Sequence, residues 1–184
     1  LATISNKTLF YTGRLFTDFD LSIISSTSPS DLEKQVILNT IEISANKGYS
    51  LLFGGSAFDK KMALTALKKG IRTGVFLPSG IAKSAEKMNL HGSFSQLTIL
   101  SFGDPFIQFN KIEYLPSVLS RILLPRKVLF TTSKLQWIMK HKKVFLQNKV
   151  DSYFLISETN DLDIEAANTI MSKAIDEHGL YNII

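Results

Sequence analysis

The chain has 184 residues, 45% of them hydrophobic, and a net charge of +5, which is enough sequence to bury one core in a single domain. Its apolar runs are far shorter than the roughly 20 residues of a membrane span, and its N-terminus lacks a charged-then-apolar signal pattern. The absence of cysteine excludes disulfides, thiolate metal sites and a cysteine nucleophile. We therefore expect a cytoplasmic protein, with Leu1 marking a trimmed or partial chain.

An aromatic segment with one glycine turn, residues 8–20, precedes a buried strand over residues 21–25 (LSIIS). Strands and helices alternate from this strand onward. We therefore separate an N-terminal segment, 1–20, from a single domain, 21–184, that closes with a helix.

A turn rich in serine follows the first strand and leads into a helix. Ser30 and Glu33 match the S-x-x-E capping box, which satisfies free backbone N–H groups at a helix start. Apolar residues then recur at helical spacing to about Lys47, and Gly48 stands where a left-handed residue ends a helix. These signals predict a helix over residues 31–47.

Residues 51–80 predict the unit around which the chain is organised. A short apolar strand meets Gly54, Gly55 and Ser56, an amphipathic helix runs to Gly70, and a second strand follows. Where parallel strands end in glycine turns, backbone N–H groups and a helix N-terminus face one crevice and suit phosphate groups. The pattern therefore favours a phosphate-bearing ligand.

The remaining elements continue the alternation of strands and helices. Such alternation predicts an α/β fold, a Rossmann-like, doubly wound, mostly parallel sheet with helices on both faces. The expected elements are a helix over 81–90, a strand over 97–101, a helix over 112–124 ended by Pro125, a strand over 127–131, a short helix capped by Ser133, a strand over 143–146, a final strand or docking segment over 153–156, and a closing helix over 164–175.

Positive charge is concentrated in one block of the chain. Residues 111–150 carry a net charge of +8, whereas residues 151–184 carry −6. Clustered lysine and arginine are typical of polyanion binders, because each phosphate contact releases condensed counterions. An ordinary solvated face, neutralised by the acidic tail, explains the same pattern equally well.

Motifs for common catalytic chemistry are absent. The sequence lacks a Walker A loop, a G-x-G-x-x-G turn after the first strand and a G-x-S-x-G elbow. His91, His141 and His178 lack the spacing of metal ligands, so we expect no metal, no cofactor and no enzyme activity. Asp59 is either a polar group inside the crevice or a first-turn helix residue favoured by the helix dipole.

Aromatic residues offer a second clue to a nucleic-acid ligand. Phe109, Tyr114 and Trp137 have rings on which bases can stack, an interaction worth about 1–3 kcal/mol per base. Aromatic residues at helical spacing more often belong to a core, however. We therefore predict that Trp137 packs in the interior.

The order of elements and five short matches resemble the Rossmann-like domain of the DprA/Smf family of DNA-processing proteins. The resemblance extends from about Thr8 to Asn148. Its matches are TLFYTGRL at 8–15, IISSTSPS at 23–30, FGGSAFD at 53–59, MALTAL at 62–67 and TGVFLPSGI at 73–81.

The resemblance implies a protein that binds single-stranded DNA without catalysis, forms a homodimer and helps to load RecA in natural transformation or recombination. Some family positions differ here: a phosphate-binding arginine falls on Thr27, a glycine falls on Ser25, and Arg121 alone is basic in a later family segment. The expected DNA-binding residues are Ser26, Thr27, Gly54, Gly55, Ser56, Gly80, Lys111, Arg121, Arg126, Lys127, Lys142 and Lys143.

Two other functions remain open. One is a nucleotide-binding or nucleotide-processing protein of the same broader fold, with Asp59 in the crevice. The other is a scaffold that has lost DNA binding, which the missing arginine at Thr27 favours.

Overall fold

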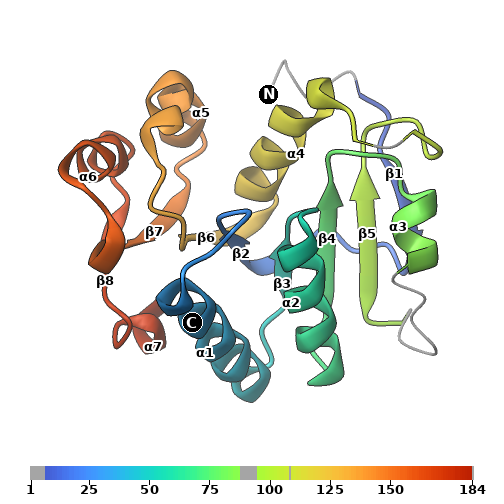
Figure 1. Ribbon diagram of the computed structural model, residues 1–184, viewed down its shortest axis with the longest axis horizontal. Helices are drawn as coiled ribbons and strands as arrows, with labels where there is room; N and C mark the ends of the chain where they lie inside the picture. The colour runs from blue at the N-terminus through green and yellow to red at the C-terminus, as the bar shows by residue number, and fades with distance from the viewer. Residues whose placement is uncertain (1–6, 88–94, 108, 184) are drawn as a thin grey trace.

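The computed structural model describes residues 7–87, 95–107 and 109–183 (Figure 1). Within these residues, eight strands form one sheet in the order β1-β5-β4-β3-β2-β6-β7-β8, and only β1 runs antiparallel to its neighbour. The strands are β1 (Phe10–Gly13), β2 (Phe19–Ile24), β3 (Leu51–Phe53), β4 (Thr73–Leu77), β5 (Leu97–Ser101), β6 (Pro125–Phe130), β7 (Asp151–Leu155) and β8 (Lys173–Ile175).

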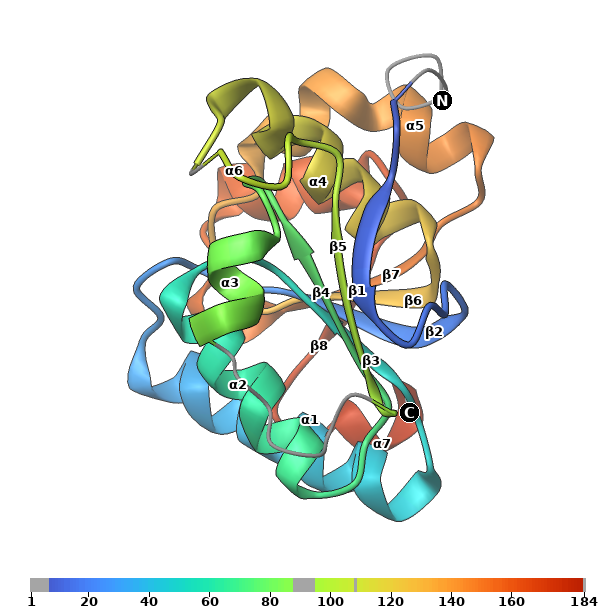
Figure 2. The same cartoon turned by 90° about the vertical axis from the view of Figure 1, so that its right-hand side faces the viewer.

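Helices cover both faces of the sheet, as Figure 2 shows. Leu21 and Ile23 of β2 face α1, α2 and α7, whereas Ile24 and Phe130 face α4, α5 and α6. The predicted α/β, Rossmann-like, doubly wound sheet is therefore confirmed. The helices are α1 (Asp31–Lys47), α2 (Ala57–Lys68), α3 (Ala82–Lys87), α4 (Lys111–Leu123), α5 (Lys142–Gln147), α6 (Asp161–Asn168) and α7 (Leu180–Ile183), with the 3-10 helices η1 (Gln136–His141) and η2 (Ile156–Glu158).

The strand order reverses at β2. The chain adds β3, β4 and β5 on one side of β2 and then adds β6, β7 and β8 on its other side. In a doubly wound sheet, ligands bind where the order reverses, at the carboxyl ends of the two strands concerned. The topology therefore directs attention to the ends of β2 and β6.

The N-terminal segment contributes to the same sheet. β1 pairs with β5, and Gly13 ends it in a left-handed conformation with φ of 86°. The predicted boundary at residue 20 falls within β2. No helix in the described part of the chain is long and apolar enough to cross a membrane.

Local capping signals explain where helices α1 and α2 start. The Ser30 side chain accepts a hydrogen bond from the Glu33 N–H, and Gly48, with φ of 70°, ends α1 as predicted. Ser56 and Asp59 form a reciprocal capping box at the start of α2. Of the helix predicted over 81–90, α3 is confirmed, while residues 88–90 and His91 lie outside the described residues.

The strand predicted over residues 143–146 is wrong, because these residues lie in α5. Phe145 is buried beside Phe130, whereas Leu146 is 43% exposed, so only one side of this segment meets the core. The place beside β6 is taken by β7. A short apolar run does not distinguish a strand from one face of a helix.

The closing helix predicted over residues 164–175 is wrong beyond Asn168. Met171 adopts a left-handed conformation with φ of 60°, and Lys173–Ile175 then pairs with β7 as the edge strand β8. Met171 is 75% exposed, so its apolar side chain is not on a core face. Pairing with the open edge of β7 therefore overrides the helical spacing of the sequence.

The predicted Ser133 cap is also wrong. Helix η1 begins after Leu135 with no side-chain cap of its own. Instead, the buried Asp163 carboxylate of α6 accepts hydrogen bonds from the backbone N–H groups of Leu135 at 2.6 Å and Gln136 at 2.9 Å. The cap thus comes from a helix that lies next to η1 in space but not in sequence.

We expect Asp163→Ala to lower the free energy of unfolding by about 2–3 kcal/mol, because two N–H groups lose a charged acceptor. Chemical denaturation measures this loss. The matched control is Asp161→Ala, whose side chain is exposed in the same helical turn and which should cost less than about 1 kcal/mol. Equal losses for the two variants would contradict the assigned cap.

Candidate functional site

A cavity of about 680 Å³ opens at the carboxyl ends of β2 and β6, where the strand order reverses. We call it the switch-point crevice. It is bounded by the turn after β2, the start of α1, one side of α4, the turn after β6, and η1. Its lining residues are Ile24, Ser25, Ser26, Thr27, Ser28, Ser30, Glu33, Tyr114, Leu115, Val118, Arg121, Thr132, Ser133, Lys134, Trp137 and His141.

The buried Glu33 carboxylate joins the two turns that form the crevice. Its Oε1 accepts hydrogen bonds from the Ser26 N–H at 2.8 Å and from the Thr131 hydroxyl at 2.9 Å. The Ser26 hydroxyl also donates to Thr132 Oγ1 at 3.0 Å. These bonds hold the ends of β2 and β6 in one arrangement although the strands are far apart in sequence.

Asp59 holds the neighbouring ends of β2 and β3 together. Its Oδ1 accepts from the Ser25 hydroxyl at 2.7 Å, and its Oδ2 accepts from both the hydroxyl and the N–H of Ser56. Asp59 is thus a capping residue in the first turn of α2. Because the same carboxylate also reaches Ser25, it has donors on both oxygens.

Arg121 projects from α4 to the crevice and lies in an unusual environment. The side chain is only 7% exposed, and its Nε is buried with no hydrogen-bond partner among the described residues. Burial lowers the pKa of Arg121, whereas its electrostatic interaction with the nearby Asp59 carboxylate raises it. An arginine keeps its proton in proteins, so a cation lies at the floor of the crevice.

Gly54 makes room for this cation. A Cβ at this position would collide with the guanidinium of Arg121 and with the carboxylate of Asp59. Arg121 and Asp59 are therefore close neighbours, yet they form no ion pair. The glycine predicted as a ligand-binding position acts first by admitting a buried arginine.

The structure brings some of the predicted site residues together at one edge of the sheet. Ser26, Thr27 and Arg121 line the crevice, and Gly54, Gly55 and Ser56 follow β3 beside it. Lys142 and Lys143 are exposed at the start of α5, directly after the lining residue His141, and Lys111 is exposed at the start of α4.

Three predicted residues lie elsewhere. Arg126 and Lys127 are near the start of β6, so they lie at the amino-terminal ends of the parallel strands, opposite the crevice. There Arg126 pairs with Asp20 at 3.7 Å, and Lys127 donates to the Ile183 carbonyl. Gly80 packs beneath the loop at 104–107, and its N–H donates to Ile107. The basic block of the sequence is therefore divided between two edges.

The acidic tail does not neutralise the basic block through ion pairs. Among the described residues, no ion pair joins residues 111–150 to the acidic residues after 150. Lys173, for example, pairs with Asp151 within the tail itself. The exposed lysines near the crevice thus remain available to an anionic ligand.

Several lining residues were missed from the predicted site, among them Glu33, Lys134 and His141. The sequence pattern assigns Glu33 only to a capping box, and Lys134 lines the crevice because it follows the end of β6. Trp137 packs against Phe130 and Phe145 as predicted, although it also borders the crevice. The signal for these residues is the strand order, which the sequence pattern does not reveal.

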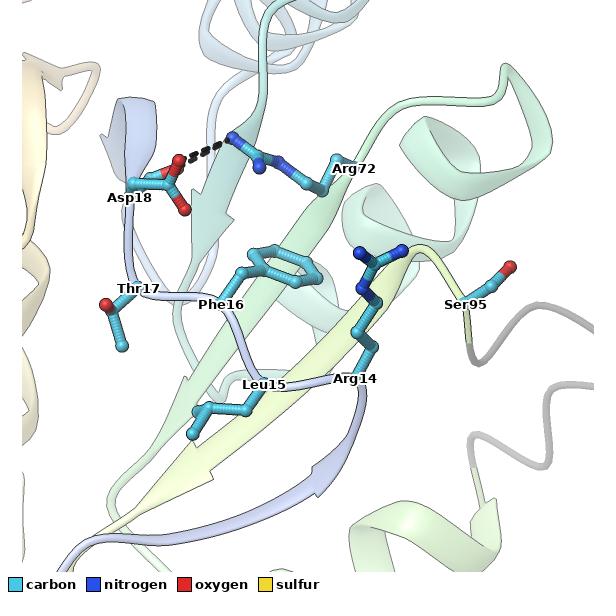
Figure 3. A pocket seen from close by; sticks show the side chains of 7 residues that line it. All are labelled: Arg14, Leu15, Phe16, Thr17, Asp18, Arg72 and Ser95. Carbon is cyan, nitrogen blue, oxygen red and sulfur yellow. Dashed lines mark hydrogen bonds and ion pairs between the residues drawn. The ribbon is translucent and has the colours of Figure 1, made fainter.

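A second hollow lies at the amino-terminal ends of the parallel strands, beside the segment that joins β1 to β2 (Figure 3). Here Arg72 donates hydrogen bonds to the Asp18 carbonyl and carboxylate, and its guanidinium lies 5.1 Å from the centre of the Phe16 ring. Because this arginine is satisfied within the fold, the hollow lacks the unpaired buried donor found in the switch-point crevice.

The chemistry of the switch-point crevice suits an anion with several oxygens. Helices α1 and α2 both start at this edge, where their N-termini carry partial positive charge. Hydroxyl groups and Arg121 add further donors. In the described residues, no group of three histidine, aspartate or glutamate side chains is placed to hold a metal ion.

Comparison with solved structures identifies the same fold in two DNA-processing proteins. DNA processing protein A from Helicobacter pylori, studied for its single-stranded DNA binding mode, matches with a TM-score of 0.71 and 17% identity over 95% of this chain and 85% of that chain. DNA processing protein A (DprA) from Streptococcus pneumoniae matches with a TM-score of 0.70 and 15% identity over 95% of this chain.

The chain spans 65% of the length of the Streptococcus pneumoniae protein. No protein-family model and no curated protein sequence matches. The resemblance predicted from short motifs is thus confirmed at the level of the fold.

We expect Gly54→Ala to lower the free energy of unfolding by about 1–3 kcal/mol, because the added methyl group overpacks a site where Arg121 is buried and Asp59 is held by hydrogen bonds. Thermal denaturation provides the measurement. Gly103→Ala is the matched control: its Cβ would meet no atom closer than 3.6 Å, and we expect a change within about 0.5 kcal/mol. A neutral Gly54→Ala would show that Arg121 does not occupy this position.

Proposed function

We propose that this chain binds single-stranded DNA at the switch-point crevice without catalysing a reaction. The observation that carries the proposal is the buried Arg121 that lines the crevice and has no hydrogen-bond or ion-pair partner among the described residues. The N-terminus of α1 and several hydroxyl groups line the same crevice, and such groups suit a phosphate. The shared fold supports the choice of nucleic acid, because one protein of that fold is described by its single-stranded DNA binding mode.

A path for the DNA backbone follows from the distribution of donors. One phosphate occupies the crevice near Ser26, Thr27 and Arg121, beside the turn at 54–56. The DNA backbone then passes Lys134, just before η1, and the exposed lysines Lys142 and Lys143. Gly80, Arg126 and Lys127 lie away from this path.

Aromatic side chains border the same path. Tyr114 is half-exposed at the crevice and lies near Phe109, with ring centroids 6.5 Å apart. Trp137 presents part of its ring to the cavity while packing against the core. A base next to an anchored phosphate can therefore stack on one of these rings, a contact that favours single strands with unpaired bases.

The biological part of the proposal rests on the resemblance to the DprA/Smf family. We propose a cytoplasmic protein that acts in DNA processing during natural transformation or recombination. Homodimer formation and contact with RecA belong to the same proposal.

A nucleotide-binding protein is the second candidate. The crevice volume of about 680 Å³ lies within the range of roughly 300–1,000 Å³ of small-molecule sites. One phosphate on Arg121 and one base on Tyr114 describe a mononucleotide as well as one unit of a strand. The lysines beyond the crevice favour the longer ligand.

Titration with labelled oligo-dT tests the proposal. We expect binding whose log affinity falls with log salt at a slope of about −2 to −3, as three or four neutralised phosphates require for a single strand. Trp137 is the sole tryptophan of the chain and borders the crevice, so its fluorescence should change on binding. Absence of binding at low salt by a folded protein would contradict the proposal, and a response to mononucleotides alone would favour the second candidate.

Charge reversal locates the path. We expect Lys142→Glu or Lys143→Glu to weaken oligo-dT binding and to make the salt slope shallower by about 0.7–1, because one phosphate contact is lost. Arg126→Glu changes the net charge equally at the opposite edge of the sheet and should leave the slope unchanged. Equal effects of all three variants would indicate general electrostatic attraction without a defined path.

A further inference from the structure

The guanidinium of Arg121 lacks what native structures normally provide for a buried donor. An arginine side chain carries five N–H donors, and buried polar groups are almost always hydrogen-bonded. Here the side chain is 7% exposed, and it forms no hydrogen bond or ion pair with any residue that the structure describes. Within the described residues, Arg121 is therefore a buried cation to which the protein itself offers no hydrogen-bond acceptor.

Asp59 does not satisfy this cation. Its carboxylate lies near the guanidinium, but its oxygens accept hydrogen bonds from Ser25 and Ser56 and it forms no ion pair with Arg121. The carboxylate stabilises the charged state of Arg121 from a distance. Asp59 therefore leaves the guanidinium without a hydrogen bond to any described residue, and Arg121 is one of the residues that line the crevice.

The surroundings of Arg121 define what that ligand is. The hydroxyl groups of Thr27, Ser28 and Ser133 line the same cavity and donate to no described residue. A guanidinium binds two oxygens of a phosphate through a planar fork, and hydroxyl groups can serve a remaining oxygen. A carboxylate has no third oxygen to use this arrangement.

On these grounds, and resting on the proposed function, we propose that Arg121 is the phosphate anchor of the switch-point crevice. It supplies from α4 a guanidinium that the turn after β2 lacks, since Thr27 occupies the crevice side of that turn. Bound phosphate completes the hydrogen bonds of Arg121, and Gly54 leaves the space in which the guanidinium lies. Arg121 is thus a ligand-binding residue whose presence costs stability until the ligand is bound.

Removing the Arg121 charge should leave the stability of the protein without ligand unchanged or raise it, and should weaken the binding of phosphate and oligo-dT. In Arg121→Met, a side chain of similar length removes the buried charge, so the ligand-free variant should unfold at the same temperature as the wild type or at a higher one. Phosphate, added against chloride at constant ionic strength, should raise the midpoint of the wild type and leave that of the variant unchanged. Oligo-dT affinity should fall about tenfold or more, because charge-assisted hydrogen bonds are lost.

Two further variants separate charge from geometry and control for surface effects. Arg121→Lys keeps the charge and loses the planar fork, so it should retain part of the phosphate response. Arg126→Met removes an exposed arginine at the opposite edge and should behave like the wild type in both assays. A phosphate response that disappears equally in Arg126→Met would contradict the assignment.

A rescue experiment tests whether an arginine at position 27 can replace Arg121 as the phosphate ligand. Thr27 lines the cavity opposite α4, so an arginine placed there faces the same ligand. In Thr27→Arg combined with Arg121→Met, we expect the phosphate response and most of the oligo-dT affinity to return. Failure of this rescue, after both are lost in Arg121→Met, would overturn the equivalence of the two positions.

The outcomes distinguish this inference from the proposed function. If the wild type responds to phosphate and dTMP through Arg121 but does not bind oligo-dT, Arg121 is the phosphate anchor and the proposed DNA binding is wrong. If oligo-dT binds the wild type and Arg121→Met equally well, DNA binding is supported and the role of Arg121 as phosphate anchor is wrong. A ligand-free Arg121→Met that unfolds well below the wild type also contradicts the anchor, since Arg121 would then be a structural residue.

Discussion

The switch-point crevice depends on the buried carboxylate of Glu33. β2 and β6 are neighbours in the sheet but are separated by three strands in the chain, so no local turn connects their ends. Glu33 makes this connection by accepting from Ser26 after β2 and from Thr131 after β6. A buried carboxylate with such donors is stabilised, whereas an isolated one would be costly. Glu33 and Asp59 thus hold the ends of the strands together through hydrogen bonds to neutral donors, and neither forms an ion pair with Arg121.

Much of the fold was predictable because its determinants are local. Ser30 and Gly48 mark the ends of α1, and Ser56 with Asp59 marks the start of α2, all within a few residues of the helices concerned. The errors occur where distant segments decide. Asp163 supplies the cap of η1 across space, β7 recruits residues 173–175 as an edge strand, and packing of Phe145 turns an apolar run into a helix. No periodicity within those segments carries this information.

The site was predictable in part. Glycine and serine turns at the ends of parallel strands correctly indicated the edge of the sheet at which the crevice opens, and Ser26, Thr27 and Arg121 line it. The prediction centred on the turn after β3, however, since the sequence does not show that the strand order reverses at β2. Net charge was similarly misleading. The net charge of +8 in residues 111–150 suggested one basic surface. Strand β6, however, carries Arg126 and Lys127 at its start and Lys134 after its end, so these residues lie on opposite sides of the molecule.

The replacement of an arginine by threonine at position 27 first favoured loss of ligand binding. In the structure, however, the guanidinium of Arg121 reaches the same crevice from α4. If Arg121 had only a structural role, selection for stability would favour a partner for it or an apolar side chain in its place. A buried arginine without a partner, next to a glycine that leaves space for it, is instead the pattern of a site that exchanges stability for ligand affinity. Under the proposed function, the charge that the family carries in the turn after β2 is supplied here from helix α4.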